Sequence, residues 1–198
     1  RILAVTVASE RILKTTGAWS YFAEEKISPF REMHVWDENG DGKICFESAS
    51  ICEPVMGYII EYNVIANALH KRISCLENVN YISGVSPKLI KKEIDAINIE
   101  TDNGRKLKTK LLVGADGSNS VVRKLCNINF QKHDYEQSAL TCVVTSEIEH
   151  GEIARQRFLS DGPLAFLPMK SPNKSAIVWS AKPQRIQQLL KSNKTVFH

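Results

Sequence analysis

Asp116 is the residue whose type and setting in this sequence could do chemistry. It stands in the stretch Gly114-Ala115-Asp116-Gly117, directly after the apolar run Leu111–Val113. An apolar run that ends at glycine predicts a buried strand entering a tight turn. The glycines permit backbone angles and close approaches that a side chain would block. Ligands of α/β proteins bind at that edge of the sheet, so we expect Asp116 to accept hydrogen bonds from ligand hydroxyls.

The residues after the turn predict a helix. Ser118–Ser120 are natural N-cap types, and Val121 and Val122 begin an apolar face. Arg123 would lie one to two turns into this helix, where its guanidinium could meet a phosphate. The alternative is a solvent-facing turn with a surface Arg, which is the usual explanation for a bare Gly-x-Asp-Gly. The longer string Gly114-Ala-Asp-Gly-x-x-Ser120-x-Val-Arg123 is more specific, and it favours a ligand site.

The composition limits the class of protein. The chain has 198 residues, with 43% hydrophobic and 24% charged residues, which are ordinary values for one globular domain or parts of two. The net charge is +4, and apart from Lys88, Lys91 and Lys92 the lysines are scattered. No arginine-rich run occurs, so we expect no nucleic-acid partner. Peripheral contact between a basic face and an anionic membrane stays open as an alternative.

The cysteines and the apolar runs bear on the cellular compartment. The five cysteines are odd in number, irregular in spacing and without a Cys-x-x-Cys, so we expect no disulfide framework and a reducing compartment. No apolar run approaches the ~20 residues that span a bilayer, and no signal peptide is visible. These features predict a cytoplasmic location, with a peripheral position at the inner face of the membrane as an option. The start at Arg1 in a β-like run, without an initiating Met, indicates a piece of a longer protein.

Local patterns predict α/β segments that alternate with all-β segments. Strands are expected at 2–7, around 33–35 and 44–46, and at 57–60, 79–82, 94–100, 106–113, 140–144, 153–159, 164–169 and 175–180. Helices are expected at 10–16 with Ser9 as the cap, from 63 to 74, from about 118 to 125, and from 183 onward. The polar segments 37–42 and 102–104 are typical of hairpin loops. The simplest organisation has two interleaved domains, one with the strand–turn–helix and one with an antiparallel sheet.

Other candidate sites have ordinary explanations. Asp37–Gly42 resembles the start of an EF-hand loop, but the twelfth position is Ser48 rather than the bidentate Glu that calcium needs. A polar hairpin turn is therefore favoured, and no metal site is expected because the five histidines lack paired spacing. An aromatic group is expected in the core or in packing between domains, with the lining of an apolar substrate channel as the alternative. Its members are Trp19, Tyr21, Phe22, Phe30 and Trp36.

The string from Gly114 to Arg123 resembles the second flavin motif of FAD-dependent aromatic monooxygenases, where it touches both FAD and the nicotinamide cofactor. Further strings are similar to the ubiquinone-biosynthesis hydroxylases, the 2-polyprenylphenol and 2-octaprenyl-methoxyphenol hydroxylases. They are Arg1–Ala4, Gly57–Ile65, His133–Ala139, Gly162–Met169 and Ile177–Ser180, and they run from end to end of the chain. This group is a branch of the class that includes hydroxybenzoate hydroxylase.

The resemblance implies a mixed α/β fold of hydroxybenzoate-hydroxylase type. It places a partial FAD-binding domain at 1–27 and 59–135, interleaved with an antiparallel β-sheet substrate domain at 28–58 and 136–198. The implied cofactor-binding residues are Gly114, Ala115, Asp116, Gly117, Ser120, Arg123 and Arg1. The implied substrate-binding residues are Phe166, Leu167 and Pro168, beside Met169.

The resemblance also implies the reaction. NADH or NADPH reduces FAD, the reduced flavin takes up O2 to form a C4a-hydroperoxide, and the ring of a polyprenylated phenol is hydroxylated. The cofactor carries this chemistry, so no side chain is expected to be catalytic. Other quinone-biosynthesis proteins are expected as partners. The open alternatives are a related flavin hydroxylase or halogenase of another aromatic substrate, and a non-catalytic scaffold or lipid-binding subunit.

Three departures from the family pattern qualify these expectations. The sequence has neither the Gly-x-Gly-x-x-Gly turn that binds the ADP half of FAD nor the family's later Gly-Asp motif. One motif alone would hardly offset the cost of ordering so large a cofactor. We therefore expect the 198-residue chain alone to hold FAD poorly and to be inactive. The third departure is Tyr62, where the family usually has an amide or Arg, and Glu61 or Asn63 could take its place.

Overall fold

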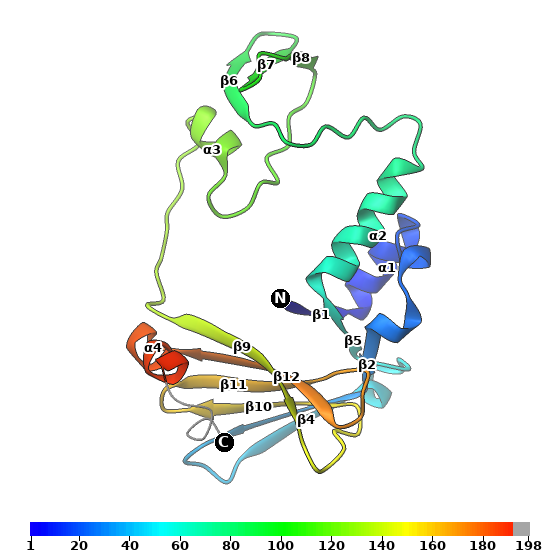
Figure 1. Ribbon diagram of the computed structural model, residues 1–198, viewed down its shortest axis with the longest axis vertical. Coiled ribbons are helices and arrows are strands. Elements are labelled where there is room, and N and C mark those ends of the chain that lie inside the picture. Colours follow the sequence, from blue (N-terminus) through cyan, green and yellow to red (C-terminus); the bar gives the residue numbers. More distant parts are fainter. Residues whose placement is uncertain (192–198) are drawn as a thin grey trace. The chain divides into compact units, whose positions relative to one another are not determined.

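The computed structural model describes residues 1–191, which form two compact units. The larger unit joins Arg1–Val79 to the chain from Asp134 onward, and the smaller unit is Asn80–His133 (Figure 1). The boundaries of these units differ from those expected for an FAD-type domain and a substrate domain, so that division stays a prediction. Residues 192–198 of the expected substrate domain lie outside the described part. Among the described residues, no helix is long and apolar enough to cross a membrane.

A six-stranded sheet forms most of the larger unit, with the strand order β4-β3-β10-β11-β12-β9. Its strands are β3 (Glu32–Asp37), β4 (Lys43–Glu47), β9 (Ser138–Thr145), β10 (Ile153–Leu159), β11 (Gly162–Pro168) and β12 (Lys174–Ala181). The alternation of the sequence predicts these strands, and they are confirmed. The expectation of a wholly antiparallel sheet is wrong at one pair, because β3 and β10 run parallel, with Met33 opposite Ala154. A parallel pair needs a long connection, and here the intervening chain of more than a hundred residues supplies it.

A second, three-stranded sheet has the order β1-β5-β2 and is antiparallel throughout. Its strands are β1 (Ile2–Thr6), β2 (Ile27–Phe30) and β5 (Gly57–Glu61). Buried Val5, Ile27 and Ile60 pack on the helix side of this sheet, with Ala68 of α2 (Tyr62–Ser74). A second buried cluster of Phe30, Ile59 and Ala154 joins it to the six-stranded sheet.

The sequence patterns missed β2, and they also missed three short 3-10 helices. These are η1 (Trp19–Tyr21), η2 (Glu24–Lys26) and η3 (Ser48–Ile51). The helix after 183 is confirmed as α4 (Pro183–Lys191), where Ile186 packs on Leu140 and Ala181 of the six-stranded sheet. The core prediction for the aromatic group holds for Phe22 and Phe30, which are both buried.

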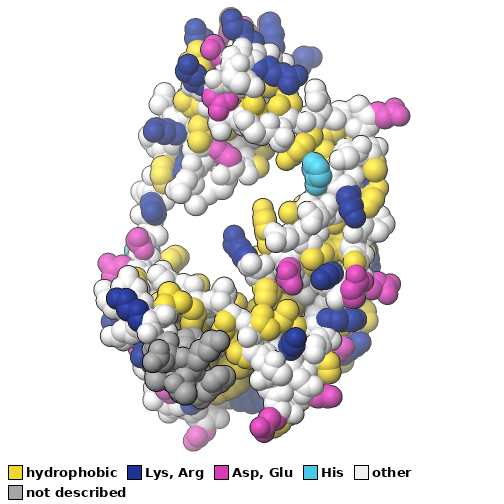
Figure 2. All heavy atoms as spheres, viewed as in Figure 1, with side chains coloured by type: hydrophobic (Ala, Val, Ile, Leu, Met, Phe, Trp, Pro, Cys, Tyr) yellow, Lys and Arg dark blue, Asp and Glu magenta, His cyan; other side chains and the backbone are white. Residues whose placement is uncertain are grey.

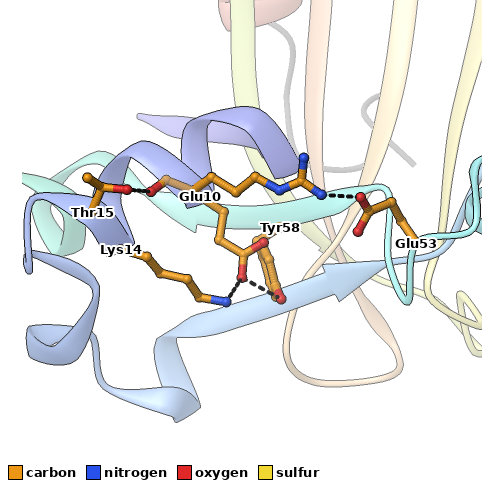
Figure 3. A network of polar contacts seen from close by, with 6 residues as sticks. Glu10, Lys14, Thr15, Glu53 and Tyr58 are labelled. Atoms are coloured by element: carbon orange, nitrogen blue, oxygen red, sulfur yellow. Dashed lines mark hydrogen bonds and ion pairs between the residues drawn. The ribbon is translucent and has the colours of Figure 1, made fainter.

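The helix α1 (Val7–Thr15) is fixed to β5 by a polar network (Figure 3). Buried Glu10 accepts a hydrogen bond from the Tyr58 hydroxyl at 3.3 Å and forms an ion pair with Lys14 at 2.7 Å. The expected cap was wrong: the helix starts at Val7, and Thr6 rather than Ser9 is the N-cap. Thr6 takes this place because β1 runs directly into the helix, so its side chain meets the Ser9 N–H at 3.4 Å.

The smaller unit consists of a three-stranded antiparallel sheet and one short helix. Its elements are β6 (Pro87–Lys92), β7 (Ile97–Thr101), β8 (Lys106–Thr109) and α3 (Val121–Leu125). The hairpin at 102–104 is confirmed, β6 was missed, and no strand forms at 79–82. The larger unit has its confirmed hairpin at 37–42, where the Asp37 carboxylate accepts from the Asn39 N–H at 2.8 Å. Within residues 1–191, no group of three His, Cys, Asp or Glu side chains could hold a metal ion.

The expected buried strand at Leu111–Val113 is wrong. The strand β8 ends at Thr109, and the following segment is irregular, with Leu111 73% and Val113 71% exposed. A strand needs backbone hydrogen bonds from a neighbour, and no strand of the described chain pairs with this segment. The apolar run therefore predicted that Leu111 and Val113 would be buried, but both are exposed among the described residues.

Candidate functional site

Asp116 ties the Gly114–Ser120 turn to the start of α3. One carboxylate oxygen, Oδ2, accepts hydrogen bonds from the backbone N–H groups of Val121 at 2.6 Å and Val122 at 3.2 Å. The other oxygen, Oδ1, accepts from the Ser120 hydroxyl. A carboxylate has about four lone-pair sites, so these three donors leave room for one more. Asp116 is also exposed, so a ligand hydroxyl could reach that remaining site.

Ser120 completes this arrangement as the N-cap of α3. Its buried hydroxyl oxygen accepts from the Arg123 N–H at 3.0 Å, the bond that an N-cap serine makes to the third helical residue. Because the same hydroxyl donates to Asp116, one side chain binds the helix and the turn together. The predicted helix start is thus confirmed at Ser120.

Hydrogen bonds lower the pKa of Asp116 below the ordinary carboxyl value. The largest cause is the Ser120 hydroxyl, the backbone N–H groups add to it, and partial desolvation opposes them. Each of these donors favours the charged form of the carboxyl group. The turn therefore presents an ionised carboxylate at neutral pH.

The two glycines of the turn serve different purposes. A Cβ at Gly114 would lie 3.1 Å from Val122 Cγ1, so this glycine lets the turn pack closely on α3. Gly117 has φ +86°, a conformation that costs glycine little, and a Cβ there would meet nothing within 4 Å. The turn is therefore open on the side of Gly117, where a ligand could approach the backbone.

Arg123 is held within the smaller unit. Its guanidinium lies over the ring of Phe130, 3.9 Å from the centroid, and Nη2 donates to the Ser118 carbonyl. The Nε atom is buried and has no hydrogen-bond partner in the described structure. A contact from Arg123 to a phosphate stays a prediction. Sequence reasoning missed Phe130, an exposed aromatic residue beyond the helix end that gave no signal except its type.

The remaining predicted site residues belong to the larger unit. Arg1 precedes β1, is exposed, and accepts a hydrogen bond from the Tyr62 N–H through its carbonyl at 2.9 Å. On β11, Phe166 is 40% exposed, Leu167 packs against a core cluster, and Pro168 is less than 2% exposed. The structure thus brings together the residues from Gly114 to Arg123, while Arg1 and the β11 residues form part of another unit.

The turn therefore combines an ionised carboxylate, which accepts hydrogen bonds, with a nearby arginine. Residues 85–194, more than half of the chain, match the family model described as FAD binding domain. The chain belongs to the FAD binding domain family. Its turn fits FAD, because the exposed carboxylate has a free lone pair and the backbone at Gly117 is open.

Curated relatives are similar to this chain along nearly its whole length. The chain is 35% identical over 207 residues to "Ubiquinone biosynthesis monooxygenase COQ6, mitochondrial" of Danio rerio. This match covers 100% of the chain and 42% of that relative. It is 32% identical over 193 residues to "3-demethoxyubiquinol 3-hydroxylase" of Escherichia coli K12, covering 98% of the chain and 49% of that relative. The chain thus spans less than half the length of these relatives. The resemblance to the ubiquinone-biosynthesis hydroxylases is confirmed.

The fold also has relatives among solved structures. The crystal structure of pqsL, "a probable FAD-dependent monooxygenase" from Pseudomonas aeruginosa, superposes with a TM-score of 0.77 at 19% identity. The match covers 94% of this chain and 52% of that one. At this identity the likeness shows the fold, and it confirms the expected mixed α/β fold of FAD-dependent monooxygenases.

Proposed function

We propose that the full-length protein is an FAD-dependent monooxygenase that hydroxylates the ring of a polyprenylated phenol in ubiquinone biosynthesis. NADH or NADPH and O2 are the proposed co-substrates. The observation that carries the proposal is the end-to-end similarity to relatives whose names are ubiquinone hydroxylases and monooxygenases. FAD, when bound, supplies the oxygen-transfer chemistry, and the protein supplies binding and orientation.

The proposed role of the turn residues is to bind the cofactor. Asp116 accepts a hydrogen bond from a cofactor hydroxyl through its remaining lone pair, and the local donors keep it ionised. Gly114, Ala115 and Gly117 provide a backbone surface without bulky side chains. Arg123, held by Phe130, adds positive charge close to the turn. Arg1 is proposed as a further cofactor contact.

The proposed substrate contacts are on β11. Phe166 has an exposed ring that can contact an aromatic substrate, whereas Leu167 and Pro168 pack inside and fix the strand. Other quinone-biosynthesis proteins are proposed as partners. The animal relatives are named mitochondrial, so we propose that this protein lies where its organism makes ubiquinone.

The test of the cofactor site is the Asp116→Ala variant of the full-length protein. We expect loss of bound flavin in the purified variant, measured by its absorbance, and a matching loss of NAD(P)H oxidation. Asp95→Ala, at an exposed position of the β6–β7 turn, is the control that should retain both. An Asp116→Ala variant with unchanged flavin content and unchanged oxidation would overturn the assignment.

The substrate is tested in a strain that lacks the gene. The proposal predicts accumulation of one unhydroxylated polyprenylated phenol, and the accumulated compound names the ring position. Turnover of a phenol without a prenyl tail, with no such accumulation, would indicate a related hydroxylase of another aromatic compound. A full-length protein that binds no flavin would indicate a scaffold instead.

A further inference from the structure

The positive charge of the chain is concentrated in the smaller unit. Residues 80–133 contain ten Lys and Arg against five Asp and Glu, a net charge of +5, whereas the whole chain carries +4. Lys and Arg side chains gather over the β6–β7–β8 sheet in the space-filling view (Figure 2). The larger unit is therefore close to neutral, and the basic character of the protein belongs to this sheet and its surroundings.

Three lysines, Lys91, Lys106 and Lys108, share one face of the β6–β7–β8 sheet, which we call the lysine face. Its six side chains are Leu89, Lys91, Asn98, Glu100, Lys106 and Lys108. Lys91 and Lys108 stand opposite Asn98 on its two sides, which places them about 10 Å apart. All three lysines of the face are exposed, and none takes part in the ion pairs of the described residues.

The opposite face of the same sheet is mainly apolar, with exposed Lys92 near its edge, opposite Ile97. Ile90, Ile97, Ile99 and Leu107 lie there, each partly buried. Alternation along the strands thus places most of the apolar side chains on one side and three of the lysines on the other. The lysine face is consequently the side of the sheet that can contact solvent or an anionic surface.

The character of the lysine face selects among anionic partners. Residues 87–110 contain no aromatic side chain on which a nucleic-acid base could stack. The face carries lysines, which act as point charges, rather than arginines, which bind a single phosphate group in a bidentate manner. A hollow of about 350 Å³ opens between Leu89, Lys91 and Lys108, and Leu89 is 42% exposed beside it. Diffuse positive charge with an exposed apolar side chain suits a surface of many anionic headgroups.

We propose that the lysine face docks the protein on a membrane that contains anionic phospholipids. This inference rests in part on the proposed function, because a polyprenylated phenol is a membrane lipid and an enzyme that acts on it must reach a bilayer.

The test is binding of the full-length flavoprotein to vesicles, measured by co-sedimentation without substrate or turnover. The vesicles are an equal mixture of phosphatidylcholine and phosphatidylglycerol, compared with pure phosphatidylcholine. Each basic residue near such a surface contributes roughly fivefold in affinity. The triple variant Lys91→Gln, Lys106→Gln and Lys108→Gln should therefore bind the anionic vesicles roughly a hundredfold more weakly. Flavin content and the oxidation of NAD(P)H with a short-chain phenol should stay unchanged.

Two further triple variants make the test specific. Replacing Lys91, Lys106 and Lys108 with Arg keeps the charge, and should keep the affinity. The control changes exposed lysines of the larger unit to Gln and should bind like the unmodified protein. Its positions are Lys43, Lys71 and Lys182.

Four results would overturn the proposal. They are equal binding to pure phosphatidylcholine, an equal loss in the control variant, no effect of the lysine-face variant, and capture of an acidic protein through this face without vesicle binding. Because the assay uses no turnover, it can fail while the hydroxylase activity stands. Conversely, vesicle binding can succeed in a protein that proves to be inactive.

Discussion

Replacing Ser120 with Ala removes the hydroxyl that joins the glycine turn to α3. That hydroxyl accepts from the Arg123 N–H at 3.0 Å and donates to an oxygen of Asp116, and Ser120 is only 7% exposed. Ala leaves the helical N–H without its cap and takes away the largest cause of the low pKa of Asp116. The ordered turn should become less stable, and the pKa of Asp116 should move up toward its ordinary value.

The size of the effect follows from the value of an N-cap. Loss of a serine cap costs about 1 kcal/mol, within a range of about 0.5–2 kcal/mol. If FAD binds only the ordered turn, the free energy of FAD binding weakens by no more than the free energy lost with the cap. The expected weakening of FAD binding therefore lies between about twofold and about thirtyfold.

The assay is a titration of the full-length apoprotein with FAD, followed by flavin fluorescence. Ser118→Ala is the matched control, because Ser118 is exposed and contributes only its backbone carbonyl to Arg123. Ser120→Thr keeps a hydroxyl and should restore most of the affinity. The reasoning is refuted if Ser120→Ala binds FAD as tightly as the unmodified protein, or if Ser118→Ala weakens binding to the same degree.

Three further predictions follow from other contacts. Because the folded pKa of Asp116 is lowered, its contribution to the turn is complete above the ordinary carboxyl range and is lost as the pH falls through the folded value. Acid should therefore release FAD, and in Asp116→Asn this pH-dependent step should be absent when flavin fluorescence is followed. Gly57→Ala would press a Cβ onto the Val5 carbonyl oxygen, which should destabilise the protein by about 2 kcal/mol, whereas Gly42→Ala has open space and should leave the thermal midpoint unchanged. Glu10→Gln should lower the thermal midpoint by less than Gly57→Ala, because the ion pair is lost while the side chain can still accept a hydrogen bond; an unchanged midpoint would contradict the role of the network.

Much of the fold is predictable from the sequence because its signals are local. The helix at 62–74 has an apolar stripe of helical period, and the strands from 138 to 181 alternate and are separated by turn residues. The parallel pairing of β3 with β10 is set by contacts between distant segments, so no local pattern predicts it. The segment at Leu111–Val113 failed for a related reason, since an apolar run does not carry the hydrogen-bonding partner that makes it a strand.

The candidate site shows the same division. The string from Gly114 to Arg123 identifies the residues of the turn, and the spacing of Ser120 before the apolar helix predicts its capping role. The sequence does not show that Asp116 accepts three hydrogen bonds from the start of α3, nor that Arg123 lies over Phe130. Those contacts depend on the backbone conformation of the turn, which the types of the single residues do not determine.

The central claim is that this chain is part of an FAD-dependent monooxygenase acting on a polyprenylated phenol, and isotope incorporation tests it most directly. The full-length protein would be incubated with FAD, NAD(P)H, a polyprenylated phenol and ¹⁸O2, and the product analysed by mass spectrometry. We predict a ring-hydroxylated product that contains one ¹⁸O atom per molecule and requires both FAD and NAD(P)H. A product oxygen that comes from water, or a flavin-loaded protein that leaves the phenol unchanged, would contradict the account.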